Sequence, residues 1–99
     1  MYLIEIKIKE NKIDGIESNK LLEQHKKWFT KNAEKGKFLL VGPFKNSGMS
    51  GMIIAKTESR KELDLILSED AYYPNLADYS IREFTANIIS DNISNYKGE

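Results

Sequence analysis

His25 is the one histidine of the chain and its clearest candidate for proton transfer. An imidazole changes charge near neutral pH, so it can act as a general acid or a general base in a pocket. The same residue falls on the apolar face of an expected helix, one turn before Trp28 and Phe29. A histidine in that position is often a core or boundary residue that makes one hydrogen bond, and both interpretations stand here.

Asp70 is the carboxylate that could assist His25. It follows an expected helix and directly precedes Ala71, Tyr72 and Tyr73. A carboxylate there can form a turn by accepting bonds from nearby backbone N–H groups. Alternatively, it can orient the imidazole and stabilise its charged form. The two residues lie far apart in the chain, so only the fold can bring them together.

A pocket around such a pair would need apolar walls and an opening. The Gly42-Pro43 step ends an expected strand, either as a plain stop or as a backbone shape that opens a cleft beside the sheet. Aromatic side chains could line an apolar pocket and add hydroxyl groups, although they more often belong to a core or an interface. The predicted substrate-binding residues are Trp28, Gly42, Pro43, Phe44, Met49 and Tyr72.

Other kinds of chemistry have little support in the sequence. The chain has no cysteine, which rules out disulfides, thiolate metal sites and cysteine nucleophiles. A lone histidine cannot form a multi-histidine metal site. Gly48 and Gly51 are too sparse for a phosphate-binding loop, and neither Ser47 nor Ser50 lies in a nucleophile elbow. We therefore expect no metal and no organic cofactor.

The charge balance and the apolar runs bear on partners and location. Fifteen basic and fifteen acidic residues cancel, whereas a nucleic-acid binder normally carries an excess of Lys and Arg. The apolar runs are far shorter than a membrane span. Met1 is followed directly by a strand pattern rather than by a signal peptide. We expect a cytoplasmic protein with a small-molecule ligand, no nucleic acid and no membrane partner.

Hydrophobic periodicity predicts the elements that must position these residues. Strict alternation over residues 2–8 indicates a half-buried strand. Apolar residues at helical spacing then indicate a helix over residues 18–35. Ser18 or Asn19 can cap its start, and Gly36 suits the left-handed position past its end.

The second half of the chain adds a hairpin, a helix and a last strand. Apolar runs at residues 38–41 and 51–55, joined by a polar loop, indicate the hairpin. A capping box at Ser59 and Glu62 opens a helix that ends near Ser68. We expect the last strand over residues 79–84. The element order is therefore βαββαβ.

This order is that of a ferredoxin-like α+β fold, an antiparallel sheet with both helices on one face. We expect one domain over residues 1–99, with a core at about 2–86 and a tail at 88–99 that is a short element or a frayed end. Residues 38–41 and 52–54 are apolar on both sides of the sheet, so its open face needs cover. A homodimer through that face is the simplest solution.

Five short motifs occur together and in order over about residues 2–86, and through them the chain resembles the YCII-related (YciI-like) family. The resemblance implies a dimeric α+β barrel and a small cleft with a His–Asp pair proposed as catalytic. That pair falls on His25 and Asp70. The motifs are His25-Lys-Lys-Trp28-Phe29, Gly36-Lys-Phe38-Leu39-Leu40-Val41-Gly42-Pro43, Gly51-Met-Ile-Ile, Asp70-Ala-Tyr-Tyr and Leu76-Ala-Asp-Tyr79-Ser-Ile81-Arg-Glu-Phe84.

The chain departs from the family pattern at three places near these motifs. Ala71 stands where a proline usually follows the family aspartate, and Asn46 stands where an aspartate often follows Gly-Pro. A glycine that is common before the position of Leu76 is absent. Similar proteins occur in aromatic catabolism, including lyase-type elimination of chloride.

These observations lead to one leading function and two alternatives. The leading hypothesis is a cofactor-independent lyase or isomerase, in which His25 moves a proton while Asp70 orients the imidazole and stabilises its charge. The first alternative is a non-catalytic ligand-binding or accessory protein that uses the same cleft. The second is a structural dimer in which the His–Asp contact supports only the fold. Turnover of a bound molecule separates the first hypothesis from the others.

Overall fold

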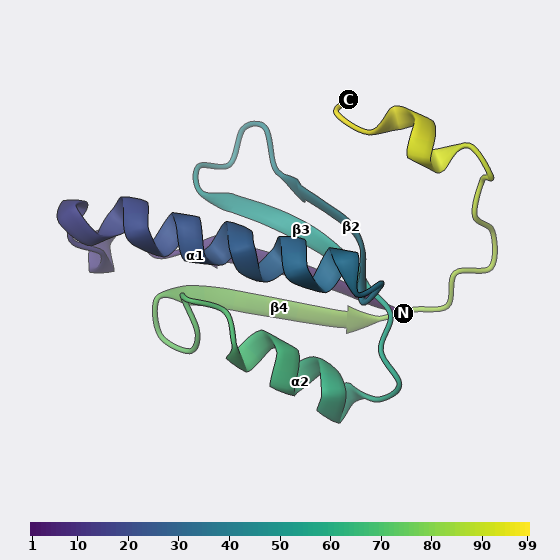
Figure 1. Cartoon of the computed structure of the whole chain (residues 1–99), viewed down its shortest axis with the longest axis horizontal. Helices are drawn as coiled ribbons and strands as arrows, with labels where there is room; N and C mark the ends of the chain where they lie inside the picture. The colour runs from purple at the N-terminus through teal and green to yellow at the C-terminus, as the bar shows by residue number, and fades with distance from the viewer.

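A computed structural model describes residues 1–99 of the protein. Four antiparallel strands form one sheet in the order β2-β3-β1-β4, and both helices lie on the same face of it (Figure 1). This is the predicted βαββαβ order of a ferredoxin-like fold. The elements are β1 (Tyr2–Ile8), η1 (Glu10–Lys12), α1 (Gly15–Glu34), β2 (Phe38–Pro43), β3 (Ser50–Ala55), α2 (Arg60–Ser68), β4 (Ala77–Glu83) and η2 (Ile93–Tyr96).

Strand β1 lies at the centre of the sheet, and its alternating sequence explains why. Its even-numbered side chains are all buried beneath the helices. In the register of the sheet, Ile4 lies opposite Ile53 of β3 on one side and Ile81 of β4 on the other. These cross-strand neighbours place β-branched side chains in one apolar row.

Helix α1 begins earlier than the periodicity predicts. Asp14 caps it, because its carboxylate accepts a hydrogen bond from the Ile16 backbone N–H at 3.1 Å. The prediction of Ser18 or Asn19 as the cap was therefore wrong. The first turn carries no buried residue, since Ile16 is 89% exposed, so the apolar pattern could not reveal it. Gly36 takes a positive φ of 76° just past the helix end, as its position predicts.

The capping box of α2 is present with one change in partner. The Ser59 hydroxyl accepts a bond from the Glu62 backbone N–H at 3.1 Å. The Glu62 carboxylate accepts from the Glu58 N–H at 2.7 Å rather than from that of Ser59. That bond and the neighbouring Lys37 ammonium lower the pKa of Glu62. The helix then ends at Ser68, as predicted.

Strand β2 continues through Gly42 and Pro43, beyond the expected end at Val41, because both residues still pair with β3. The two strands approach closely here. A side chain at Gly51 would place its Cβ 2.8 Å from the Gly42 carbonyl oxygen, so the pairing requires glycine. Strand β4 likewise begins at Ala77 rather than at Tyr79.

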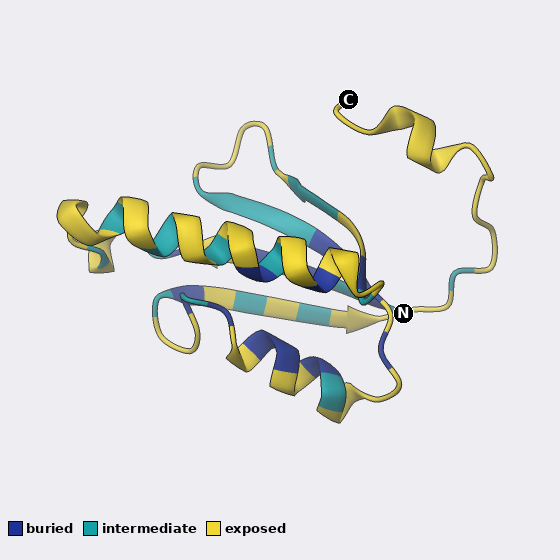
Figure 2. Cartoon of the chain, viewed as in Figure 1, coloured by how far each residue is buried: buried dark blue, intermediate teal, exposed yellow.

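The core fills the space between the sheet and the two helices, where Figure 2 shows the buried residues. Trp28 of α1 is buried there and packs edge-on against Phe38, with ring centroids 5.2 Å apart. Its indole N–H also donates to the Ile66 carbonyl oxygen of α2 at 2.9 Å. One side chain therefore joins both helices to the sheet.

The opposite face of the sheet carries no helix. Leu3 of β1 and Ile54 of β3 lie side by side there, and Leu40 of β2 lies next to Ile54. All three keep part of their surface exposed. Beyond β4 the chain leaves the sheet, and η2 lies away from it (Figure 1). No helix is both long enough and apolar enough to cross a membrane.

Candidate functional site

His25 and Asp70 meet between α1 and the end of α2. The Nδ1 atom of His25 lies 2.6 Å from Oδ1 of Asp70. Asp70 follows α2 by two residues, and its backbone N–H still bonds to the Leu67 carbonyl oxygen at 3.1 Å. Its side chain has no exposed surface, and that of His25 is 12% exposed. A buried carboxylate requires such partners.

Tyr79 of β4 supplies the second partner of this carboxylate. Its hydroxyl donates to Oδ2 of Asp70 at 2.6 Å. With the carboxyl ionised, each oxygen accepts one bond, one from the Tyr79 O–H and the other from the His25 Nδ1–H. The side chain of Asp70 is therefore fixed from two elements, and the imidazole carries its proton on Nδ1.

Aromatic rings fix the imidazole from three sides. Trp28 stacks beside it with centroids 5.5 Å apart, and Phe29 meets it edge-on at 5.3 Å. Tyr72 also meets it edge-on, at 5.1 Å. Packing of this kind restricts the ring to one rotamer. The hydrogen bond to Asp70 and this packing together give the imidazole a single orientation.

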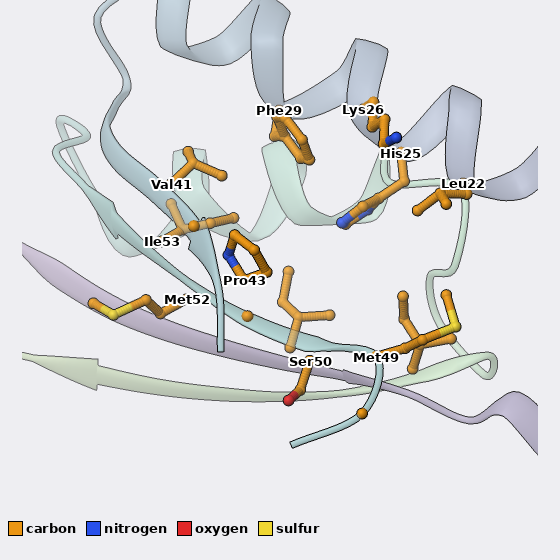
Figure 3. A pocket seen from close by; sticks show the side chains of 15 residues that line it. Leu22, His25, Lys26, Phe29, Val41, Pro43, Met49, Ser50, Met52 and Ile53 are labelled. Carbon is orange, nitrogen blue, oxygen red and sulfur yellow. The ribbon is translucent and has the colours of Figure 1, made fainter. Parts of the chain in front are cut away.

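A cavity of about 450 Å³ lies in front of the histidine. Figure 3 shows the imidazole reaching from α1 toward Pro43 and Met49 on the opposite wall. Hydrogen bonding occupies Nδ1 alone, so Nε2 has no protein partner. The other walls are mostly apolar and come from β1, α1, β2 and β3; they include Ile6, Ile8, Leu22, Phe29, Val41, Met52 and Ile53.

Comparison with known proteins identifies the family of the chain. The profile of the YCII-related domain family matches residues 1–85, which is most of the chain. The chain belongs to the YCII-related domain family. A search of curated proteins finds no match. The family match ends just past β4, so the segment that carries η2 lies outside the YCII-related domain.

The predicted binding residues of the YCII-related domain divide into two groups. Gly42, Pro43 and Met49 line the cavity together with His25. Trp28 and Tyr72 do not line it, because they lie buried behind the imidazole and support it there. We expected them to shape the wall of the pocket, and the structure corrects that expectation.

Phe44 also lies outside the cavity. It lines a second hollow of about 310 Å³, together with Glu5 and Lys7, which point from β1 to the open face of the sheet. The β2–β3 loop carries Phe44 to that face, whereas Met49 at the other end of the same loop lies in the cavity. The prediction that Phe44 belongs to the same pocket as His25 was therefore wrong.

Sequence reasoning did not single out Tyr79 as a hydrogen-bond partner of Asp70. One signal could have found it: Tyr79 lies two residues after Ala77 and two before Ile81, on the side of β4 that faces the helices. A tyrosine on a buried face needs a partner for its hydroxyl. The wall residues Leu22 and Phe29 were missed as well, although they lie three residues before and four residues after His25, a spacing that places them on adjoining turns of the same helix face. Lys26 also lines the cavity, but as the residue directly after His25 it has no such spacing.

The site contains no set of metal ligands, since no three histidine or acidic side chains lie close enough together to hold a metal ion. The titratable side chains that contact His25 or Asp70 include Tyr72 and Tyr79, and Lys26 lines the same cavity as His25. Burial and the hydrogen bond to Asp70 raise the pKa of Tyr79 far above its usual value. Burial, with the Asp70 charge second, also raises the pKa of Tyr72.

Raised tyrosine pKa values predict a loss of stability at alkaline pH. A folded state that keeps its phenol protons binds more protons than the unfolded chain once the pH passes about 10. The contribution of Tyr79 should therefore be fully present below about pH 10 and fall above it. Urea denaturation from about pH 8 to about pH 11 measures this. Tyr79→Phe should reduce the slope above about pH 10, and an unchanged slope would contradict the assignment.

Tyr79 and Tyr72 form a matched pair for a second prediction. Tyr79→Phe removes a donor to the buried carboxylate and should lower the free energy of unfolding by about 2 kcal/mol. The hydroxyl of Tyr72 is buried without a hydrogen-bond partner. Tyr72→Phe should leave stability unchanged or raise it by about 1 kcal/mol, because an unpaired polar group is removed. Urea denaturation at neutral pH compares the two, and equal losses would refute the predicted difference.

Proposed function

We propose that this YCII-related domain is a cofactor-independent lyase or isomerase in which His25 transfers a proton to or from a small molecule. One observation carries the proposal. The imidazole is held by a buried carboxylate through Nδ1, while Nε2 remains unpaired beside an apolar cavity of about 450 Å³. A histidine held in this way is suited to act as a general base.

The arrangement supports a proton transfer with a defined order of events. The lone pair of Nε2 takes a proton from a carbon next to a carbonyl group, and the electron pair of the broken C–H bond moves toward the carbonyl. The imidazolium that forms lies 2.6 Å from the Asp70 carboxylate, which stabilises its charge. His25 then returns the proton to another carbon in an isomerase. In a lyase, the electron pair expels a leaving group from the neighbouring carbon.

The surroundings favour this chemistry over hydrolysis. The cavity walls are mainly aliphatic, with Leu22, Val41 and Ile53 among them. A bound substrate would therefore displace water from around Nε2 and strengthen the electrostatic contact between His25 and Asp70. No serine hydroxyl competes as a nucleophile, because the Ser50 hydroxyl donates to the Ser47 carbonyl oxygen at 2.9 Å.

Isotope exchange tests the proposal across a whole class of candidate substrates. A panel of small carbonyl compounds with acidic C–H groups is incubated with the protein in deuterated water and followed by NMR. A substrate should lose its C–H signal with the wild type and keep it with His25→Gln. Compounds that bind without exchange or conversion would refute the enzyme and support the binding-protein alternative.

The open face of the sheet supports a second proposal, a homodimer that pairs through it. Leu3, Leu40 and Ile54 lie there without a covering helix, and a second copy would bury them. The cavity beside His25 lies between α1 and the sheet, on the face opposite to Leu3, Leu40 and Ile54, so this pairing does not fill it. Light scattering at micromolar concentration should give twice the mass of the chain, and Ile54→Lys should give a monomer. A monomeric wild type would refute the dimer.

A further inference from the structure

We propose that the cavity selects a compact apolar molecule with one carboxylate, and that Lys26 binds this carboxylate at the rim. This inference rests on the proposed function, because it names the class of substrate for the same site. Lys26 follows His25 directly on α1 and lines the cavity beside it (Figure 3). Nothing in the sequence pattern distinguished it from the other lysines of this helix.

The composition of the cavity wall is the first observation. Lys26 is the only lysine or arginine that lines the cavity, and no aspartate or glutamate lines it. Asp70 lies behind the imidazole, where His25 and Tyr79 occupy both of its oxygens. The formal charge along the wall is therefore positive, and a cationic ligand would find no partner there.

The second observation is that the ammonium group of Lys26 has no acidic partner within the protein. Its neighbour Lys27 lies 3.8 Å from Glu23 one turn earlier, in an exposed ion pair. Lys26 forms no ion pair and no side-chain hydrogen bond. An ammonium group on a flexible stem at the mouth of an apolar cavity can reach a ligand without leaving an acidic partner behind.

The position of the charge limits how a ligand can lie. A carboxylate deep in the cavity would lose its hydration without compensation, because the inner walls are aliphatic. At the rim it can contact Lys26 and keep part of its hydration. The apolar body of the ligand then packs against Phe29 and Met49. Because Lys26 and His25 line the same cavity, a ligand held by its carboxylate at the rim can extend its carbons toward Nε2.

The volume sets the size of the ligand. About 450 Å³ lies in the lower part of the range for small-molecule sites. The cavity therefore fits a compact acid with one ring or a branched chain. A nucleotide would bring several charges that the apolar walls cannot compensate.

Binding of matched compounds tests the inference directly. Phenylpropionate, its neutral amide and the corresponding amine have the same apolar body and differ in charge. Titrations followed through the NMR signals of His25 should show the acid binding about fivefold more tightly than the amide, and the amine most weakly. Added salt should reduce the preference, because the contact at the rim is exposed.

Two variants with the same charge change show whether Lys26 is responsible. Lys26→Gln should reduce the preference for the acid to about twofold or less. Lys27→Gln, on the solvent side of the same helix, should leave it unchanged. Equal affinity for acid and amide, equal effects of the two variants, or no binding of any of the compounds would overturn the inference.

The two proposals fail in different ways. If the acid preference depends on Lys26 but no carbonyl compound exchanges its protons, the proposed ligand class is supported and the proposed enzyme activity is refuted. If proton exchange depends on His25 while the acid and the amide bind equally, the proposed enzyme activity is supported and the proposed ligand class is refuted.

Discussion

Replacing Asp70 with asparagine should slow proton transfer by His25 by about 100-fold or more. The reason lies in the bond from Tyr79. Its hydroxyl donates to one oxygen of Asp70, and in the variant it should keep donating to the amide oxygen. The amide NH₂ group then faces Nδ1 of His25, which must accept rather than donate. The ring proton moves to Nε2, and the atom that faces the cavity can no longer act as a base.

The single histidine makes this prediction easy to measure. Nitrogen NMR of the imidazole should report a proton on Nδ1 in the wild type and on Nε2 in Asp70→Asn, with no substrate present. Isotope exchange of any substrate found should fall in the same variant. Glu69→Gln is the matched control, since it removes the same charge from the exposed neighbouring residue. Persistence of the Nδ1 proton in Asp70→Asn would disprove this mechanism.

Much of the fold could be predicted because the start, the end or the buried face of several elements depends on residues that are close together in the sequence. The alternation of residues 2–8 fixes one face of β1 as buried, and a positive φ at the end of α1 requires a residue such as Gly36. Ser59 and Glu62 mark the start of α2 before any contact is known. Each of these signals depends on neighbours within a few residues.

The site could be predicted only in part, because its contacts join distant elements. His25 and Asp70 had suitable chemistry, but a distance of 2.6 Å between them depends on how α1 and α2 pack. The role of Tyr79 depends on which face of β4 meets that pair. Phe44 and Met49 belong to one loop and point to opposite sides of the sheet. Spacing along a chain carries no such information when the loop has no regular period.

The packing of α2 determines whether Asp70 reaches His25, so its core residue Leu63 should have a large effect on stability. Leu63 has no exposed surface, whereas Leu65 of the same helix is 66% exposed. Leu63→Ala should lower the free energy of unfolding by about 3 kcal/mol, because it removes buried methyl groups and leaves a cavity. That is a large share of the roughly 5–15 kcal/mol that stabilises a typical domain.

Urea denaturation followed by circular dichroism measures this loss, with Leu65→Ala as the control. The control should change stability by no more than about 0.5 kcal/mol, since the Leu65 side chain is mostly exposed and alanine suits a helix. Similar losses in both variants would show that helix propensity rather than core packing holds α2 in place. A large loss in Leu63→Ala alone would mean that core packing rather than helix propensity holds α2, the helix that leads into Asp70, against the sheet.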